Sequence, residues 1–154
     1  MHVISTIMHR FVYQTVDFPV LAIDGVPIQH WIKSQIFDQY GNDETHTLVP
    51  AQHWLSDDGE ARTAWQLLDP ANKGSTVVPL LVCPDDRDLS CTVVVVEQVT
   101  DAERVVWKRF GLSTHNIGSV VTSVDWSDNE QHACFERKQF EEAFAEFKRL
   151  ARCD

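Results

Sequence analysis

The chain has 154 residues, of which 44% are hydrophobic and 23% charged, and its 13 Lys and Arg against 23 Asp and Glu give a formal net charge of −10. A chain of this length is typical of one domain, which buries enough apolar surface to fold without a metal or a disulfide. The negative charge argues against a nucleic-acid partner, because phosphate backbones need clustered cations, and it is compatible with a basic protein partner.

The first part of the chain predicts short elements. Residues 10–24 predict two short strands with a break near residues 17–19, and the Asp-Gly pair at residues 24–25 is typical of a turn. Hydrophobic residues at helical spacing predict a short amphipathic helix over residues 27–37. The polar residues 38–47 that follow predict a loop.

A better-defined helix follows in the chain. Residues 50–55 are compatible with either a helix or a strand. Residues 56–58 (Ser-Asp-Asp) are a typical N-cap, and hydrophobic residues then recur at i, i+3, i+4 and i+7 from Ala61 to Leu68. This spacing predicts a helix over residues 59–68 that ends before Pro70.

The strongest strand signal lies between Val77 and Phe110. β-Branched and aromatic residues dominate residues 77–83, 91–99 and 104–110. The segment between the first two strands is too polar to continue a strand, and a tight turn is predicted at residues 100–103. Consecutive strands joined by short turns favour antiparallel pairing.

The C-terminal part predicts two more strands and the clearest helix. After an expected loop at residues 111–118, residues 119–126 and 132–135 predict strands. Residues 138–151 carry one apolar stripe that includes three phenylalanines. We therefore predict a single α+β domain over residues 1–154, with a mostly antiparallel sheet and the C-terminal amphipathic helix packed on one face.

No motif identifies a catalytic centre or a cofactor site. The seven histidines form no HExxH pattern, and neither a glycine-rich phosphate loop nor a nucleophile elbow occurs. We therefore assign no catalytic and no cofactor-binding residue. The sequence leaves enzymatic activity open and favours a protein without one.

The four cysteines, Cys83, Cys91, Cys134 and Cys153, are too few for a disulfide scaffold in a chain of this length. The chain also lacks a secretory signal pattern and an apolar run long enough to span a membrane, so we expect a cytoplasmic protein. Zinc sites space paired cysteines by two to four residues, whereas seven separate Cys83 from Cys91. We therefore expect no metal site and interpret the cysteines as small hydrophobic residues.

Two acidic turns are the candidates for binding a partner. One lies between the two cysteines, and the other follows Trp126, where an aromatic residue beside acidic residues suits a protein interface. The candidate residues are Asp85, Asp86, Asp88, Trp126, Asp128 and Glu130. With the net charge, they favour a non-enzymatic protein-binding module, such as an immunity or antitoxin-like partner of a basic protein. The alternative is a metal-binding, redox-active or enzymatic site at the Cys83–Cys91 turn, where Arg87 would favour a thiolate and the aspartates would oppose it.

Four segments resemble the motifs of a family of small bacterial proteins, common in actinobacteria, whose activity is not established. The family motifs are DG-x-P/S-L, C-P-x-C-G-D-x-G-C-G, V-x-W-x-D-F and F-x-F-D-R-x-x-Y. The matching segments are DGVPI at residues 24–28, CPDDRDLSCT at 83–92, VVWKRF at 105–110 and CFERKQF at 134–140. The resemblance spans most of the chain and has implications for the fold more than for the function.

The chain departs from these motifs at several positions. Asp86 stands where the family has its second cysteine, and Arg87, Ser90 and Thr92 stand where it has glycine. The resemblance therefore carries no metal or redox property over to this chain. Glu136 replaces the helix-capping aspartate of the family and is expected to be a poorer cap.

Overall fold

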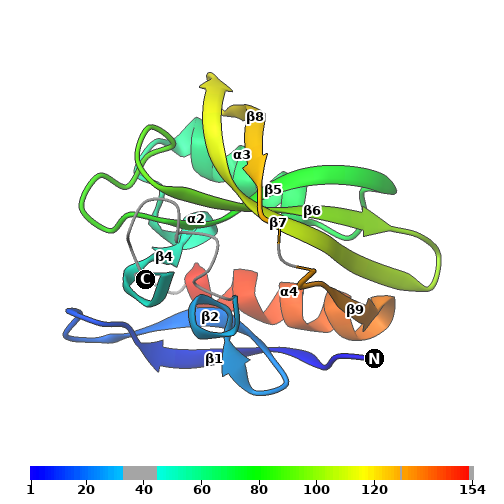
Figure 1. Ribbon diagram of the computed structural model, residues 1–154. Helices are drawn as coiled ribbons and strands as arrows, with labels where there is room; N and C mark the ends of the chain where they lie inside the picture. Colours follow the sequence, from blue (N-terminus) through cyan, green and yellow to red (C-terminus); the bar gives the residue numbers. More distant parts are fainter. Residues whose placement is uncertain (33–44, 129, 153–154) are drawn as a thin grey trace.

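The computed structural model describes residues 1–32, 45–128 and 130–152. In this part of the chain the strands form a three-stranded sheet from the N-terminal residues and a six-stranded sheet from later ones (Figure 1). All strand pairs are antiparallel. The predicted α+β class with mostly antiparallel sheet is therefore confirmed, although the strands divide into two sheets.

The three-stranded sheet has the order β1 (Ile4–Arg10), β2 (Asp17–Ile23), β3 (Val26–Pro27). Asp24 and Gly25 have φ of 51° and 82°, and this left-handed pair makes the predicted Asp-Gly turn. The break expected near residues 17–19 is wrong, because those residues begin β2 and pair with β1. Pro19 is tolerated there because β3 pairs only with Ala22 and Ile23, further along β2.

The six-stranded sheet follows the order of the chain. It contains β4 (Val49–Pro50), β5 (Gly74–Val82), β6 (Val93–Thr100), β7 (Arg104–Ile117) and β8 (Val120–Trp126), and β9 (Ala133–Glu136) pairs with the first part of β7. The predicted turn between β6 and β7 is present. The backbone N–H of Asp101 donates to the carbonyl of Arg104 at 3.0 Å.

Strand β7 is longer than expected, and the loop predicted at residues 111–118 is wrong. Residues 111–117 continue β7 and pair with β8. Gly111 suggested a loop in the sequence, but it allows close strand contact: a Cβ atom there would lie 2.6 Å from Cγ1 of Val124 and 2.7 Å from the carbonyl oxygen of Asp125. The segment beyond Leu112 is largely exposed, so it lacks the alternating pattern that reveals a half-buried strand.

In the described part of the chain, the α-helices between β3 and β5 are short except for one. They are α1 (Ile28–Trp31), α2 (Ala51–Trp54) and α3 (Asp58–Leu68). The helix expected over residues 27–37 ends early, because Ile32 adopts an extended backbone, and residues 33–37 lie outside the described residues. Of the expected loop at 38–47, only Thr45–Thr47 is described, as a 3-10 turn. Helix α3 begins as predicted, with Asp57 accepting from the N–H of Glu60 at 2.9 Å.

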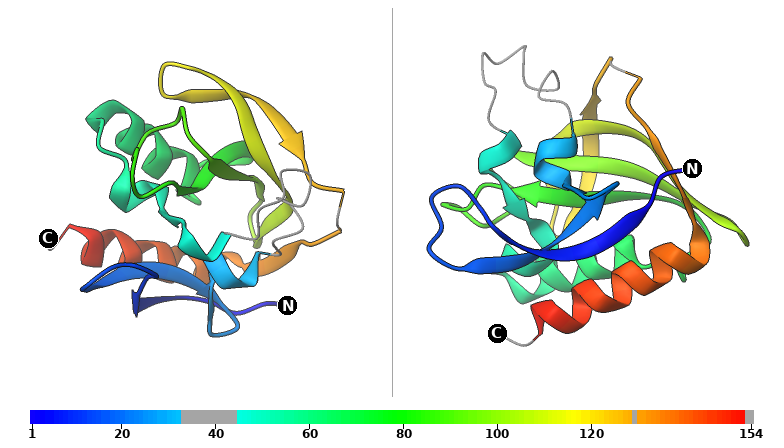
Figure 2. Two further views of the ribbon diagram at one scale, coloured as in Figure 1. Left: turned by 60° about the vertical axis from the view of Figure 1, so that its left-hand side comes forward. Right: turned by 90° about the horizontal axis from the view of Figure 1, so that it is seen from below.

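Helix α4 (Arg137–Ala151) lies between the two sheets (Figures 1 and 2). It packs against β1 and β2 and also contacts β7 and β9. Phe140, Phe144 and Phe147 are buried, as the apolar stripe predicted. Glu136 at the N-cap makes no side-chain capping hydrogen bond, in agreement with the expected poorer cap.

A buried polar network fixes the middle of the six-stranded sheet. Trp107 is fully buried in β7, and its indole N–H donates to Oε1 of Gln98 at 2.9 Å. The amide nitrogen of Gln98 donates in turn to the carbonyl of Leu68 at 2.9 Å. The indole of Trp107 and the amide of Gln98 thus satisfy one another and the Leu68 carbonyl, and this network holds β6, β7 and the end of α3 in one arrangement. The opposite end of β6 carries the turn described next.

Candidate functional site

The loop between β5 and β6, residues 83–92, is folded tightly on itself. The N–H of Arg87 donates to the carbonyl of Cys83 at 3.0 Å. Both the N–H and the hydroxyl of Ser90 donate to Oδ1 of Asp88, at 3.0 and 2.7 Å. Leu89 is 3% exposed and anchors the loop in the core. These contacts give the loop a defined backbone shape.

This loop brings three potential metal ligands together. A sulfur of Cys83, a carboxylate oxygen of Asp86 and a sulfur of Cys91 all lie within 4.8 Å of one another. The cause is the strand pairing: Val82 lies opposite Val93, so residues that follow β5 and precede β6 meet at the end of the hairpin. Cys83 and Cys91 are therefore close in space, although the seven residues between them in the sequence argued against a metal site.

The three groups differ in exposure and in their protonation. Cys83 and Cys91 are half-buried, and Asp86 is exposed. Burial, and to a smaller extent a hydrogen bond with Asp86, together raise the pKa of the Cys91 thiol to about 11. The Arg87 guanidinium donates instead to the carbonyl of Trp54 at 2.9 Å. The expected stabilisation of a thiolate by Arg87 is thus outweighed, so Cys91 is a thiol at neutral pH.

Further carboxylates surround the loop. Burial raises the pKa of Glu60 in the first turn of α3, and the nearby charges of Asp57 and Asp88 raise it further. These couplings place negative charge beside the loop. A negative field favours the arrival of a cation and opposes the formation of a free thiolate.

The second acidic group predicted from the sequence lies in a different loop, after β8. Trp126 is half-buried under the guanidinium of Arg109, whose Cζ lies 4.0 Å from the ring centroid. Asp128 and Glu130 are exposed. Among the described residues, the one cluster of potential metal ligands near Asp86 contains neither Asp128 nor Glu130, and Trp126 packs against Arg109 of β7 instead. The six candidate residues therefore form two separate groups.

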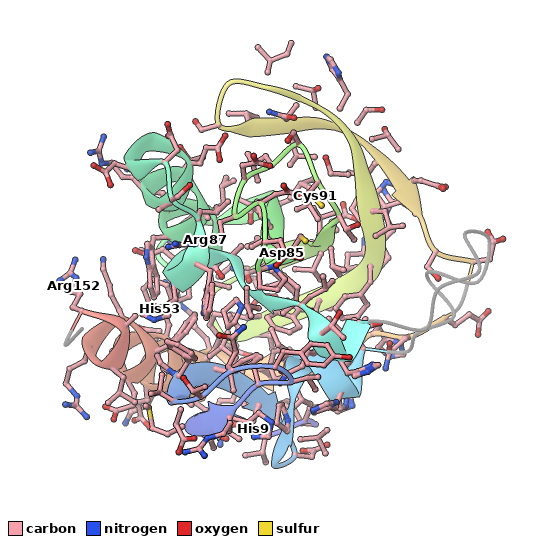
Figure 3. The ribbon with its side chains drawn as sticks, turned by 90° about the vertical axis from the view of Figure 1, so that its left-hand side faces the viewer. His9, His53, Asp85, Arg87, Cys91 and Arg152 are labelled. Atoms are coloured by element: carbon pink, nitrogen blue, oxygen red, sulfur yellow. The ribbon has the colours of Figure 1, made fainter. Side chains whose placement is uncertain are left out.

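The structure also contains a cleft that the sequence did not reveal. Its walls are Phe18, His53, Trp54, Arg87 and Ala151, and its volume is about 460 Å³. Figure 3 labels His53 and Arg87 among these residues. These residues come from β2, α2, the β5–β6 loop and the end of α4. They are far apart in the sequence, so they form no sequence motif. Only the aromatic pair His53-Trp54 is adjacent in sequence.

Comparison with models of known protein families, with curated proteins and with solved structures finds no match to this chain. Among the described residues, no helix combines the length and the apolar character needed to cross a membrane.

Proposed function

We propose that the β5–β6 loop binds a thiophilic divalent metal ion such as Zn²⁺ through Cys83, Asp86 and Cys91. The observation that carries this proposal is the approach of the three donor atoms to within 4.8 Å of one another. Thiolate sulfur and carboxylate oxygen are both zinc ligands. This proposal replaces the expectation of no metal site, which rested on the spacing of Cys83 and Cys91 and on the lack of a second cysteine pair in the sequence.

The donor set suits a site with one open position. Zinc is usually four-coordinate, and three protein ligands leave one position for water or for an atom of a binding partner. A metal ion would displace the protons of both thiols, because only the thiolate coordinates. In a reducing cytoplasm, where we place this protein, the thiols would stay reduced and available.

The test is a titration of reduced, metal-free protein with Co²⁺ and Zn²⁺. We expect Co²⁺ to give an intense near-ultraviolet sulfur-to-metal absorption at one equivalent, and Zn²⁺ to displace it. Cys83→Ser and Cys91→Ser should abolish this absorption, and Asp86→Asn should weaken binding. Cys134→Ser is the matched control, because Cys134 is also half-buried but lies in β9, away from the loop.

Two results would contradict the metal site. One is wild-type protein that gives no sulfur-to-cobalt absorption although all its thiols are shown to be reduced. The other is a Cys134→Ser variant that loses the absorption as completely as the two loop variants. Thiol counting before and after reductant separates this proposal from a reversible disulfide in the loop.

A second candidate function is binding of a basic protein partner, as for an immunity or antitoxin-like protein. It is favoured by the exposure of Asp85, Asp86, Asp128 and Glu130 in a chain of net charge −10. Opposite charge accelerates association between proteins. The same charge gives no reason to propose a nucleic-acid partner.

This candidate is tested by affinity capture from the native host at low and high salt. We expect a basic protein that wild type retains at low salt, releases at high salt, and loses in the Asp85→Asn/Asp128→Asn double variant. A Glu103→Gln/Glu142→Gln variant removes the same charge at other exposed positions and should retain the partner. Equal loss in both variants would show a general charge effect instead of a binding surface.

A further inference from the structure

We propose that the cleft lined by Phe18, His53, Trp54, Arg87 and Ala151 binds a small aromatic carboxylate. The cleft lies where β2, α2, the β5–β6 loop and the end of α4 meet (Figure 3). Its volume of about 460 Å³ falls in the range of sites that hold small organic ligands. This proposal goes beyond metal binding and does not require it.

The aromatic wall suits a planar ligand. The rings of Phe18 and Trp54 are 4.8 Å apart in an edge-to-face arrangement, and the ring of His53 lies 5.6 Å from Phe18. All three side chains are half-buried, so part of each ring is packed and part faces the cleft. A further aromatic ring gains the same edge and face contacts when it enters such a cluster.

The cationic wall suits a carboxylate. Arg87 places its guanidinium over the ring of Trp54, with Cζ 5.6 Å from the centroid, and its Nε donates to the Trp54 carbonyl. Within the described part of the chain, its two terminal nitrogens have no hydrogen-bond partner. A planar guanidinium held in this way offers a preformed fork for a carboxylate.

The charge of the lining differs from that of the molecule. The chain carries −10, yet none of the five lining residues is acidic. Arg152 follows Ala151 at the end of α4 and lies on the same side of the molecule as His53 and Arg87 (Figure 3). A carboxylate that enters the cleft therefore meets cationic side chains and no acidic residue in its lining.

Arg87 is held in this position at a conformational cost. Its φ of 53° is left-handed, a conformation that side chains other than glycine rarely adopt. The backbone of Arg87 is fixed by Cys83 and by Ser56, whose N–H donates to the Arg87 carbonyl at 3.0 Å. These contacts and the bond to Trp54 hold the guanidinium in the lining of the cleft before any ligand arrives, which lowers the entropic cost of binding.

The test is an NMR titration of ¹⁵N-labelled wild-type protein with benzoate, acetate, inorganic phosphate and benzyl alcohol. We expect benzoate to shift the signals of the cleft residues with saturation, and to bind more tightly than the three other probes. Arg87→Gln should weaken benzoate binding by about tenfold or more, because it removes a charged hydrogen bond. Phe18→Leu should also weaken binding while keeping the wall apolar.

The matched control is Arg109→Gln. Arg109 also lies over a tryptophan and donates through Nε, to Glu97 at 2.8 Å, but it is outside the cleft. This variant should bind benzoate like wild type. The spectra also report whether each variant is folded. If Arg87→Gln disturbs the loop, the loss of benzoate binding in Phe18→Leu is the result that decides the test.

Four outcomes overturn the proposal. Acetate or phosphate binding as tightly as benzoate would show an anion site without recognition of the ring. Benzyl alcohol binding as tightly would show an apolar site without recognition of the carboxylate. Absence of saturable benzoate shifts, or an equal loss in Arg109→Gln, would show that the cleft binds no aromatic carboxylate.

Discussion

At the scale of single residues, Glu60 is a charge held in an unfavourable place. One of its carboxylate oxygens is buried and finds no hydrogen-bond partner among the described residues. Burial raises its pKa, and the charges of Asp57 and Asp88 add to the increase. Ionisation of this carboxylate is therefore unfavourable in the folded protein, and ionisable groups with shifted pKa values are common near sites that bind ligands or ions.

The raised pKa predicts the pH dependence of stability. The folded state binds the Glu60 proton more tightly than the unfolded state, whose pKa is near the ordinary value of 4.5. The stability contributed by that proton is therefore complete below this value and is lost as the pH rises through the higher folded pKa. We expect Glu60→Gln to be more stable than wild type at neutral pH, and to lose this advantage in acid.

Urea unfolding between acidic and neutral pH measures this effect. Glu142→Gln, at an exposed position of α4, is the control and should change stability little at any pH. A Glu60→Gln variant that is less stable than wild type at neutral pH, or whose difference does not vary with pH, would contradict the assignment.

At the scale of elements, α4 is the structural centre because both sheets pack on it. Phe147 is 1% exposed, and its ring lies 4.9 Å from that of Trp65 in α3. The apolar stripe of α4 was readable in the sequence because helical periodicity persists over four turns. Helix α3 was readable for the same reason, aided by its Asp57 cap.

Removing the Phe147 ring should destabilise the fold strongly. Phe147→Ala is expected to lower the free energy of unfolding by about 3–5 kcal/mol, because it leaves a cavity between α4 and α3. Denaturant unfolding measures the change, and Glu142→Ala, at an exposed position of the same helix, should have a small effect. A loss of under about 1 kcal/mol for Phe147→Ala would mean that the stripe does not pack as described.

At the scale of the whole molecule, the sequence predicted β5, β6, the first half of β7, β8 and β9. It predicted neither β1 nor the division of the strands into two sheets. Strand β1 (Ile4–Arg10) was not predicted, because the sequence around it has no turn signal that marks where a strand begins and ends. The distal half of β7 was missed because its exposed residues lack a buried face. Local patterns report burial and turns, whereas the sheet to which a strand belongs depends on pairing between distant segments.

The candidate sites show the same limit. The acidic residues were found because they are consecutive, but their separation into two groups depends on where β5 and β8 end. Cys83 and Cys91 were discounted on spacing along the chain, whereas strand pairing determines their distance in space. The cleft had no sequence signal because its walls come from four separate elements.

The position of the N-terminal sheet has a consequence for how the chain folds during synthesis. Strand β1 is synthesised long before α4, yet it packs on that helix: the hydroxyl of Thr6 donates to the carbonyl of Ala143 at 2.6 Å. Strands β5 to β8 pair with neighbours in the chain and can assemble early. The β1–β2 hairpin must wait with its apolar face uncovered until α4 emerges, and it is therefore the part of the nascent chain that most needs protection from aggregation.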